Sequence, residues 1–431
     1  MRVALINPPW SFDGSIYFGC REPHLPLEFG YAKAMLEEDG HEVMLLDGQL
    51  DKLSLDTIRD EHEHFGPDMT VVTTAPSYLF WRCAPPELRV PLETLAALRD
   101  SADAVVVIGP HASTTPVATL RKLAADVVVL GESEETLREL ANADRAAWRS
   151  LDHVAAVEDG QPVVRGGVRQ ADMAALPALR WRPESVARHQ HHHHRFEARP
   201  RGPGAEMETS RGCPYHCSFC AKDNFRNKYR KRPVPVILEE LDALIAQGIE
   251  YVYFIDEIFL PNRELLEALV PRPVIFGVQT RIDLWTPQML DLLGRAGCVS
   301  IEAGVESISE EGRAALDKES RLSTEEISSR LIHARGRVPF VQANLIDARL
   351  DEADAVEAWR SHLISLGVWA NKPVPLFPYP GSPDYGRLWG APDDQAWERA
   401  HDYYLRHHVE FSDIQDARPQ PLRELEAVDA R

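Results

Sequence analysis

Three cysteines within one short stretch constrain this 431-residue chain more than any other feature. Cys213, Cys217 and Cys220 follow a C-x3-C-x2-C spacing in residues 210–220, which read SRGCPYHCSFC and are called the cysteine loop below. Three thiolates at this spacing can ligate three irons of a cubane iron–sulfur cluster, whereas the four-cysteine spacing of ferredoxins would close the cluster. Because the fourth iron then stays open to an outside molecule, the spacing indicates a cluster that takes part in chemistry.

The other residues of the cysteine loop suit a chain that wraps around a cluster. Gly212 permits unusual dihedrals, Pro214 fixes φ, and the ring of Phe219 can shield the sulfurs from water. Two alternatives stay open: a structural zinc site with His216 as the fourth ligand, and three unrelated buried thiols. Neither alternative explains the segments further along the chain, so we favour the cluster.

Length and composition are those of a globular protein with two or three domains. No apolar run approaches the ~20 residues of a membrane helix, and Met1 leads directly into a strand-like segment, so we expect neither a membrane span nor a leader. Six cysteines, three of them in one loop, do not form a disulfide framework, and an oxygen-sensitive cluster needs a reducing compartment. We therefore expect a cytoplasmic protein.

The formal net charge of −20 opposes general nucleic-acid binding, because most of the surface would repel a polyanion. A basic segment directly after the cysteine loop is the local exception. It is either a solvated face or a patch that meets an anionic substrate or a cofactor phosphate. Its members are Lys222, Arg226, Lys228, Arg230, Lys231 and Arg232.

Residues 1–150 alternate apolar runs with helical patterns, which predicts a doubly wound, Rossmann-like parallel sheet. We expect strands at 2–7, 41–48, 69–74, 104–108 and 126–130, and helices at 27–39, 87–98, 117–123 and 134–140. Such sheets bind ligands beyond the carboxyl ends of their strands, where this chain has the loops NPPW, TTAPSY, GPHAST and GESEET. No G-x-G-x-x-G follows the first strand, which disfavours a dinucleotide-binding domain.

Residues 151–203 have weak periodicity and are predicted to connect two domains, with one hairpin near 154–164. They include the internal run HQHHHHR with His191–His194, which is a mobile solvated linker, a metal-binding tract or a lid. We assign this run no catalytic role.

Residues 204–390 repeat a strand–helix unit six times, which predicts a partial (β/α)6 barrel because eight units close an ordinary barrel. We expect strands at 206–209, 251–255, 274–279, 299–303, 340–346 and 368–376, and helices at 236–247, 263–269, 287–295, 324–334 and 353–366. The site should lie at the carboxyl ends of the strands, with the cysteine loop above the first. Residues 391–431 are expected to form a helical cap on the barrel and a frayed tail.

Polar residues follow the predicted barrel strands at the ends where a site would form. A run such as YVYFI is buried on both faces, so a carboxylate directly after it points toward the mouth of the barrel. An internal ion pair is the alternative role for Arg281 and Glu306. The polar residues at strand ends are Asp256, Glu257, Gln279, Arg281, Asp283, Glu302, Glu306, Ser307, Gln342, Asn344 and Asp347.

The cysteine loop, with an aromatic residue just before its third cysteine, resembles the signature of the radical S-adenosylmethionine (SAM) superfamily. The N-terminal loops resemble the cobalamin-binding domain of B12-dependent radical SAM enzymes, and QTRID, IEAGVES and FPYPGSP resemble the third, fourth and sixth strand ends of that group. The resemblance covers about residues 1–390. It implies a class B methylase-like enzyme with three cofactors: a [4Fe-4S] cluster, SAM and cobalamin.

The resemblance also implies roles for individual residues. Cys213, Cys217 and Cys220 would be the cluster ligands and the catalytic residues. Arg281 and Glu306 would hold the SAM carboxylate and ribose. Further SAM and cluster contacts would come from Phe219, Asp256, Pro378 and Tyr379, and cobalamin contacts from Pro9, Trp10, Ser77, Tyr78, Gly109, Pro110, His111, Gly131 and Glu132.

Two departures from the family pattern bear on mechanism. No D-x-H-x-x-G follows the first strand, so we expect cobalamin with its own base displaced and no histidine on the lower face of cobalt. His111 is interpreted as a contact to the cofactor's tail, with a structural role as the alternative; Trp10 and Tyr78 either shield cobalt or pack in the core. The fifth strand end reads QANLIDARL where a glycine-rich turn is frequent, so Gln342, Asn344 and Asp347 are candidates to contact the particular substrate.

The predicted activity is C-methylation of an unactivated carbon, through a 5′-deoxyadenosyl radical and methylcobalamin. The same cofactors support rearrangement or cyclisation, which stays an alternative. Methylthio transfer needs a second cluster, but the N-terminal half offers only Cys20 and Cys83, and we interpret Cys298 as an inert core thiol. A cobalamin-binding sensor or carrier is the alternative without catalysis.

Residues 202–232, with the histidines before them, are similar to the rhizo-twelve system proteins. This likeness implies a small substrate that is saccharide-like or otherwise polar, and the basic segment would suit an anionic one. We also expect an electron donor such as flavodoxin or ferredoxin, and no nucleic-acid or membrane partner.

Overall fold

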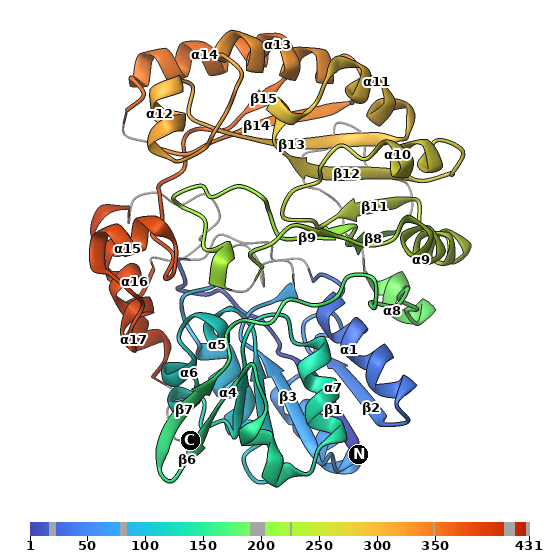
Figure 1. Cartoon of the computed structure of the whole chain (residues 1–431), viewed down its shortest axis with the longest axis vertical. Helices are drawn as coiled ribbons and strands as arrows, with labels where there is room; N and C mark the ends of the chain where they lie inside the picture. Colours follow the sequence, from blue (N-terminus) through green and yellow to red (C-terminus); the bar gives the residue numbers. More distant parts are fainter. Residues whose placement is uncertain are drawn as a thin grey trace. The chain divides into compact units, whose positions relative to one another are not determined.

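The computed structural model describes residues 1–16, 23–77, 84–189, 203–224, 226–347, 350–408 and 419–427. Internal contacts divide the chain into two compact units (Figure 1). The first unit consists of Met1–Trp181, Ala221–Asn227 and Phe377–Arg431, and the second consists of Arg182–Cys220 and Lys228–Leu376. Each unit is described by itself.

The first unit is built on a seven-stranded sheet in the order β2-β1-β3-β4-β5-β6-β7. Strands β1 to β5 are parallel, as the sequence predicts, and β6 and β7 add to one edge in antiparallel fashion. The hairpin β6–β7 therefore belongs to this sheet, although the sequence analysis placed it in the connecting segment. The strands are β1 Arg2–Asn7, β2 Glu42–Asp47, β3 Met69–Thr73, β4 Val105–Ile108, β5 Val127–Val129, β6 Val154–Glu158 and β7 Gln161–Arg165.

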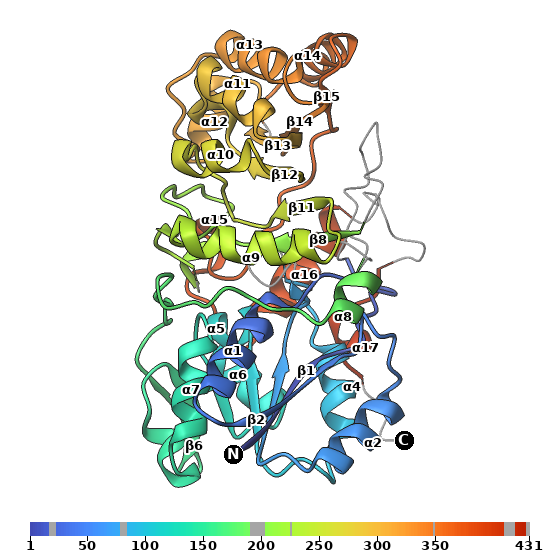
Figure 2. The same cartoon turned by 90° about the vertical axis from the view of Figure 1, so that its right-hand side faces the viewer.

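Helices cover both faces of this sheet because successive side chains of a strand point to opposite faces. Val3 and Leu5 of β1 share a buried cluster with α1 and α7, whereas Ala4 and Ile6 share another with Ile58 of α2. Figure 2 shows α2 and α4 on one side of β1 and β3, with α1 and α7 on the other. The helices are α1 Leu27–Glu38, α2 Leu55–Phe65, α4 Arg89–Ala97, α5 Pro110–Thr114, α6 Pro116–Lys122, α7 Glu134–Asn142 and the 3-10 helix η1 Arg145–Ser150.

The last described segment of the chain also packs in the first unit, through α15 Pro383–Trp389, α16 Ala396–His407 and α17 Leu422–Leu425. Trp397 and Leu422 lie in the same buried cluster as Val3 and Leu5. Lys122 of α6 forms an ion pair with Glu426 at 2.9 Å. The sequence analysis assigned α15 to the barrel and the residues of α16 and α17 to a cap on it. The structure differs because Trp397 and Leu422 enter the first unit's core.

The second unit is built on six parallel strands in the order β15-β14-β13-β12-β11-β8. Chain order equals sheet order, and β8 and β15 are the edge strands of this sheet within the described residues. This confirms the predicted partial barrel. The last strand, expected over 368–376, is only two residues long. The strands are β8 Gly204–Met207, β11 Tyr251–Phe254, β12 Ile275–Thr280, β13 Cys298–Glu306, β14 Phe340–Leu345 and β15 Trp369–Ala370.

The helices of the second unit follow the strands as predicted, with α8 and α12 in addition. The capping box of α13, in which Ser323 and Glu326 bond each other's backbone, fixes where that helix begins. The elements are α8 Pro183–Arg188, α9 Val234–Ala246, α10 Arg263–Leu269, η3 Ile282–Leu284, α11 Pro287–Arg295, α12 Glu310–Ala315, α13 Thr324–Arg335, α14 Ala353–Ser365 and the short antiparallel pair β9 Ser210–Arg211 and β10 Arg230–Lys231.

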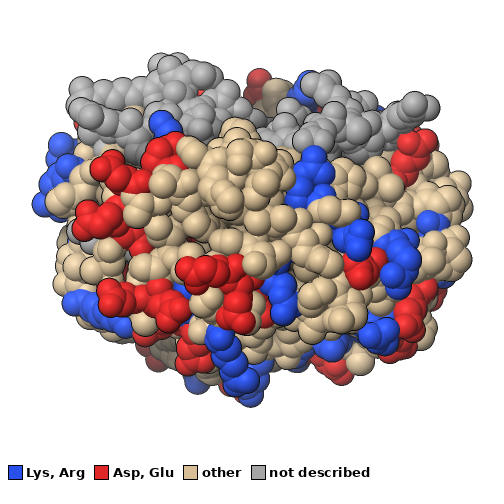
Figure 3. Space-filling view, turned by 90° about the horizontal axis from the view of Figure 1, so that it is seen from above, with Lys and Arg blue, Asp and Glu red and all other residues tan. Residues whose placement is uncertain are grey.

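No helix within the described residues is long and apolar enough to span a bilayer. On the face drawn in Figure 3, Asp and Glu lie among Lys and Arg.

Candidate functional site

The cysteine loop directly follows β8 and contains β9, at the carboxyl end of the first barrel strand. Cys213, Cys217 and Cys220 are all half-buried and none takes part in a disulfide. Gly212 has φ +77°, a conformation that side chains rarely adopt. Within the described residues, His216 and the three thiols are not gathered into a compact set of metal ligands.

Groups from three connections between strand and helix hold the cysteine loop. The backbone N–H of Gly212 donates to Glu257 Oε2 at 2.7 Å, just after β11. The guanidinium of Arg281, which follows β12, lies 4.0 Å from the ring centroid of Tyr215. The N–H of Ser218 donates to the carbonyl of Leu316, in the connection after β13, at 2.8 Å. The loop is therefore anchored at the carboxyl edge of the sheet, where the sequence predicts the site.

Arg281 and Glu306 both face the cysteine loop, and both also form ion pairs. Arg281 pairs with Asp283 at 2.8 Å, and Glu306 accepts from Lys318 at 3.0 Å. Burial raises the pKa of the Cys217 thiol, Lys318 and Arg281 lower it, and Glu306 raises it, so all three charges act on that thiol. The Nη1 atom of Arg281 is buried and has no hydrogen-bond partner among the described residues. That atom is suited to bind an anionic group.

The backbone at Glu306 is strained. Its φ is +68°, and the pairing of β13 with β14 shifts register between Gly304 and Glu306. A Cβ atom on Gly304 would lie 2.5 Å from Glu306 Oε1 and 3.2 Å from Lys318 Nζ, so a larger residue there would shift the ion pair. Strain of this kind is found most often at functional sites.

Asp256 bonds the segment that leads into the cysteine loop. The side chain is fully buried, and its carboxylate accepts from Thr209 N at 2.7 Å, from Thr209 Oγ1 at 2.5 Å and from Ser210 Oγ at 2.5 Å. Burial raises the pKa of Asp256 to about 6, although the hydrogen bonds from Ser210 and Thr209 oppose that shift. These contacts hold the segment that leads into the cysteine loop.

Half of the basic segment is buried rather than solvated. Lys222 binds Asp223 and the carbonyl of Asn227, each at 3.0 Å. Arg232 donates to the carbonyl of Glu208 at 2.9 Å and to Glu240 at 2.8 Å. Arg226 is fully buried as well, so these three residues do not form a solvated face. The exposed members are Lys228 and Lys231.

In the first unit, hydrogen bonds through Ser113 link the loops that follow β4 and β5. Ser113 Oγ donates to the carbonyl of Gly109 at 3.1 Å and accepts from the N–H of Gly131 at 2.8 Å. Both glycines have positive φ, +120° and +85°. A Cβ atom on Gly131 would lie 2.3 Å from the carbonyl oxygen of Arg169. Pro110 begins α5 directly after Gly109.

Several other residues expected to contact cobalamin have intramolecular partners. Trp10 Nε1 donates to Asn7 Oδ1 at 2.8 Å, next to Pro9. Ser77 Oγ donates to Glu28 Oε2 at 2.5 Å. Glu132 Oε2 accepts from the N–H of Ala171 at 3.0 Å. Tyr78 lies outside the described residues, as do Cys20, Cys83 and His191–His194.

His111 is a core residue. Its ring is fully buried and stacks on Trp397 with centroids 4.1 Å apart, and Nε2 lies 3.2 Å from the carbonyl of Pro86. Burial lowers the pKa of His111 to about 3. These contacts fit the structural role that the sequence left open. His111 Nδ1 has no hydrogen-bond partner among the described residues, and a contact to the cofactor's tail stays a prediction.

The structure assigns Pro378 and Tyr379 to the first unit, where Tyr379 packs against Phe377 with ring centroids 4.5 Å apart. The next carbonyl, of Pro380, accepts from Asn224 Nδ2 at 2.8 Å. This segment therefore contacts residues that directly follow Cys220 in the chain. A contact to the adenine of SAM stays a prediction.

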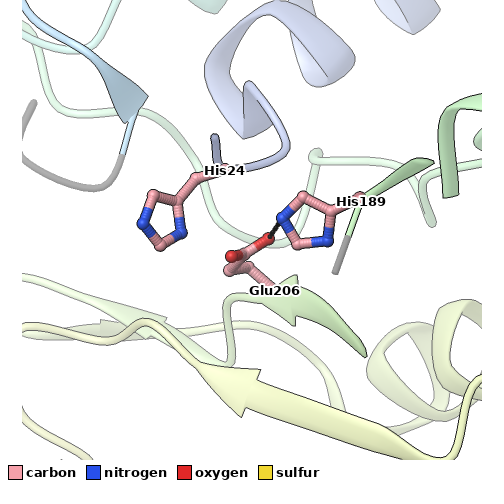
Figure 4. A group of neighbouring side chains, drawn as sticks. All are labelled: His24, His189 and Glu206. Carbon is pink, nitrogen blue, oxygen red and sulfur yellow. Dashed lines mark ion pairs between the residues drawn. The ribbon is translucent and has the colours of Figure 1, made fainter. Parts of the chain in front are cut away.

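The sequence analysis missed a buried histidine–carboxylate pair. His189 Nε2 lies 2.9 Å from Glu206 Oε2, and His189 Nδ1 lies 2.8 Å from the carbonyl of Gly204 (Figure 4). Figure 4 also labels His24, a buried residue of the first unit. The sequence offers one signal for this pair. Glu206 interrupts an apolar strand, and a buried carboxylate requires a partner.

Two hydroxyl groups near the strand ends of the first unit are buried. Thr74 follows β3 and Ser133 precedes α7, and neither side-chain oxygen has a hydrogen-bond partner among the described residues. Because buried polar groups normally have partners, these hydroxyl groups are candidates to bond a ligand.

Family models match both units. The B12 binding domain matches residues 20–141, and the radical SAM superfamily matches residues 207–342. The chain contains a B12 binding domain followed by a radical SAM domain. The solved structure of the radical SAM methyltransferase TsrM from Kitasatospora setae, with cobalamin and a [4Fe-4S] cluster bound, has a TM-score of 0.69 at 20% identity. It covers 89% of this chain and 76% of that chain, so the two proteins share a fold.

The curated relatives are longer than the part of them that this chain matches. An uncharacterized methyltransferase of Pyrococcus horikoshii is 26% identical over 327 residues, which are 72% of this chain and 66% of that protein. An anaerobic magnesium-protoporphyrin IX monomethyl ester cyclase of Cereibacter sphaeroides is 25% identical over 364 residues, which are 77% of this chain and 55% of that protein. The chain thus spans less than two thirds of the length of these relatives.

Proposed function

We propose that this protein is a cobalamin-dependent radical SAM enzyme that methylates an unactivated carbon of a small polar or saccharide-like metabolite. The observation that carries the proposal is the cysteine loop, anchored at the carboxyl edge of a radical SAM domain that follows a B12 binding domain. Two of the matched proteins are named methyltransferases, which supports methyl transfer. A [4Fe-4S] cluster, SAM and cobalamin, when bound, supply the radical and methyl-transfer chemistry.

The residues of the second unit would hold the cluster and SAM. Cys213, Cys217 and Cys220 ligate the cluster, and Glu257 fixes the start of their loop. Arg281 directs its unpartnered Nη1 atom at the SAM carboxylate, while its pair with Asp283 keeps the guanidinium in place. Glu306 is the candidate for the ribose.

The residues of the first unit would hold cobalamin. Gly109 and Gly131 allow close approach, and the hydroxyl groups of Thr74 and Ser133 can bond its amide side chains. His111 is enclosed by Trp397 and Pro86, which supports cobalamin without a histidine on the lower face of cobalt. The electron paramagnetic resonance spectrum of the Co(II) form should then lack nitrogen splitting from a protein imidazole.

A radical cyclisation or rearrangement is the second candidate, supported by the likeness to the magnesium-protoporphyrin cyclase. The electron would come from a flavodoxin or ferredoxin in either case. The rhizo-twelve likeness around the cysteine loop is the reason to favour a saccharide-like substrate.

Anaerobic reconstitution with iron, sulfide and cobalamin tests the proposal. With dithionite and SAM, we expect both 5′-deoxyadenosine and S-adenosylhomocysteine, and Cys217→Ala should lose the first product. 5′-Deoxyadenosine alone, with the native substrate present, would favour the second candidate. A wild-type protein that binds neither cluster nor cobalamin would refute both.

A further inference from the structure

Lys318 is a buried lysine in the connection between β13 and α13. It is 4% exposed, and its Nζ atom donates to Glu306 Oε1 at 3.0 Å. An ammonium group carries three N–H donors, and Glu306 is the one hydrogen-bond partner of Nζ among the described residues. Burying an ammonium group is costly unless it is paired and hydrogen-bonded. The lysine therefore has unused donors in a place where a second anionic group would stabilise it.

The backbone at the end of α12 turns Lys318 into the second unit. The N–H of Lys318 donates to the carbonyl of Arg313 at 2.9 Å, and the N–H of Asp317 donates to that of Ala314 at 3.0 Å. These two bonds form a Schellman motif, which needs a left-handed residue at the helix end. That residue is usually glycine, but here it is Asp317, with φ +49°. Backbone strain of this kind is found most often at functional sites, and here it occurs in a turn that ends on a buried lysine.

The same turn is bonded to the cysteine loop. Ser218 directly follows Cys217, and its N–H donates to the carbonyl of Leu316 at 2.8 Å. Leu316 lies two residues before Lys318. Burial raises the pKa of the Cys217 thiol most, and among the charged groups Lys318 lowers that pKa most, ahead of the opposite effect of Glu306. The ammonium group thus acts on Cys217, and Glu306 offsets its positive charge only in part.

A positive charge beside the cysteines matters because reduction adds negative charge there. A cluster that takes one electron from a reductant becomes one unit more negative, and net charge and hydrogen bonds to the sulfurs set its reduction potential. Buried charges are screened much less than exposed ones, so a nearby ammonium group stabilises the reduced state over the oxidised one. Lys318 can supply both the charge and the hydrogen bonds.

We propose that Lys318 raises the reduction potential of the cluster that the cysteine loop holds, and that Glu306 limits this effect. The ion pair then controls electron uptake as well as stabilising the fold. Lys318 forms no bond to the substrate; it determines how readily one electron passes from the reductant to the cluster. This inference rests on the proposed function, because it requires a cluster at Cys213, Cys217 and Cys220.

A redox titration followed by electron paramagnetic resonance tests this inference. The full chain is reconstituted anaerobically with iron and sulfide and titrated with dithionite without SAM, so that SAM binding plays no part. Lys318→Met removes the charge and keeps the length of the side chain. At a fixed potential we expect the ratio of reduced to oxidised cluster to fall about tenfold, which equals a midpoint about 59 mV lower for one electron. Lys318→Arg keeps the charge and should titrate like the wild type.

Glu306→Gln distinguishes this role from a purely structural ion pair. Each single variant leaves a largely buried charge without its partner, so both should lower the melting temperature. Their effects on the potential should be opposite, because Lys318→Met removes a positive charge and Glu306→Gln removes a negative one. The double variant Lys318→Met/Glu306→Gln leaves neither charge and should still titrate below the wild type, since Lys318 acts more strongly on Cys217. The double variant therefore carries the test if Lys318→Met does not retain a cluster.

Arg321→Gln is the control for a charge change in the same connection. Arg321 is exposed, so water screens its charge, and its loss should leave the midpoint unchanged. An unchanged midpoint in Lys318→Met, shifts of the same sign in Lys318→Met and Glu306→Gln, or an equal shift in Arg321→Gln would overturn the inference.

Iron and sulfide content separate this outcome from failure of the proposed function. If the wild type assembles a cluster and Lys318→Met titrates like it, the inference fails and the proposed function stands. If the wild type assembles no cluster, the proposed function fails and the inference falls with it.

Discussion

At the scale of single residues, the guanidinium of Arg281 joins three features of the site. It pairs with Asp283, stacks on Tyr215 of the cysteine loop, and keeps Nη1 without a protein partner among the described residues. An ion pair and a cofactor contact are therefore not exclusive roles for this residue, although the sequence presented them as alternatives. The ion pair fixes the orientation in which the remaining donor is available.

Tyr215 tests the stack on Arg281. A partly desolvated cation–π contact contributes about 0.5–2 kcal/mol, so Tyr215→Leu should loosen the cysteine loop and speed loss of the cluster to a chelator by about three- to thirtyfold. Tyr215→Phe keeps the ring and should behave like the wild type. The decay of the visible cluster absorbance measures the rate, and equal rates for the Leu and Phe variants would contradict the assigned role.

Asp256 should make the stability of the protein depend on pH. Its pKa in the folded state is raised to about 6 from 3.8, so the folded state binds more protons than the unfolded state between these values. The stabilisation from this group is fully present below its unfolded pKa, decreases as pH rises toward 6, and is lost above that value. Thermal melting of the apo protein between pH 4 and 7 should show this decrease in the wild type.

Asp256→Asn removes the titrating group but keeps an oxygen that can accept from Thr209 N. The difference in melting temperature between wild type and variant should therefore change across pH 4 to 6 and become constant above. If this difference in melting temperature were independent of pH, the pKa of Asp256 would not be raised in the folded state.

At the scale of elements, the alternation of strands and helices sufficed to predict both sheets, because each parallel strand is a short apolar run with turn residues at its end. Helix α2 escaped prediction because most of its residues are charged or polar and only Ile58 and His62 are buried, so few apolar residues mark it in the sequence. The anchors of the cysteine loop escaped too. Glu257 and the carbonyl of Leu316 reach it from distant positions in the chain, and no local pattern encodes such contacts.

Two glycines in different loops allow the cost of left-handed backbone strain to be measured apart from the cost of a steric clash. Gly131 and Gly160 have similar φ values, +85° and +78°, but a Cβ atom would meet Arg169 O at 2.3 Å on Gly131 and nothing within 4 Å on Gly160. Gly160→Ala should cost only the left-handed strain, about 1–2 kcal/mol. Gly131→Ala should cost more and should also weaken cobalamin retention after gel filtration. Equal stability of the two variants would show that the contact with Arg169 is easily relieved.

At the scale of the whole molecule, the last described helices pack in the first unit. Trp397 of α16 stacks on His111, donates from Nε1 to Thr115 Oγ1 at 3.1 Å, and enters the cluster that contains Val3 and Leu5. Composition alone showed residues 391–431 as polar and helical, and it could not show which unit their few apolar side chains join. The partial barrel and the doubly wound sheet could each be predicted from local pattern, and a family resemblance implied that the sheet binds cobalamin. The assignment of the terminal helices depends instead on packing between segments far apart in the sequence.

Trp397→Ala should therefore damage one unit and spare the other. Removing a buried indole costs about 3–5 kcal/mol, and here it also uncovers the ring of His111 beside the loops proposed to hold cobalamin. We expect a lower melting temperature and loss of bound cobalamin, with the cluster spectrum and its iron content retained. Leu388→Ala, at a 51% exposed position of α15, is the matched control and should change neither cofactor. If Trp397→Ala instead lost the cluster and kept cobalamin, the terminal segment would stabilise the barrel, as the sequence analysis expected.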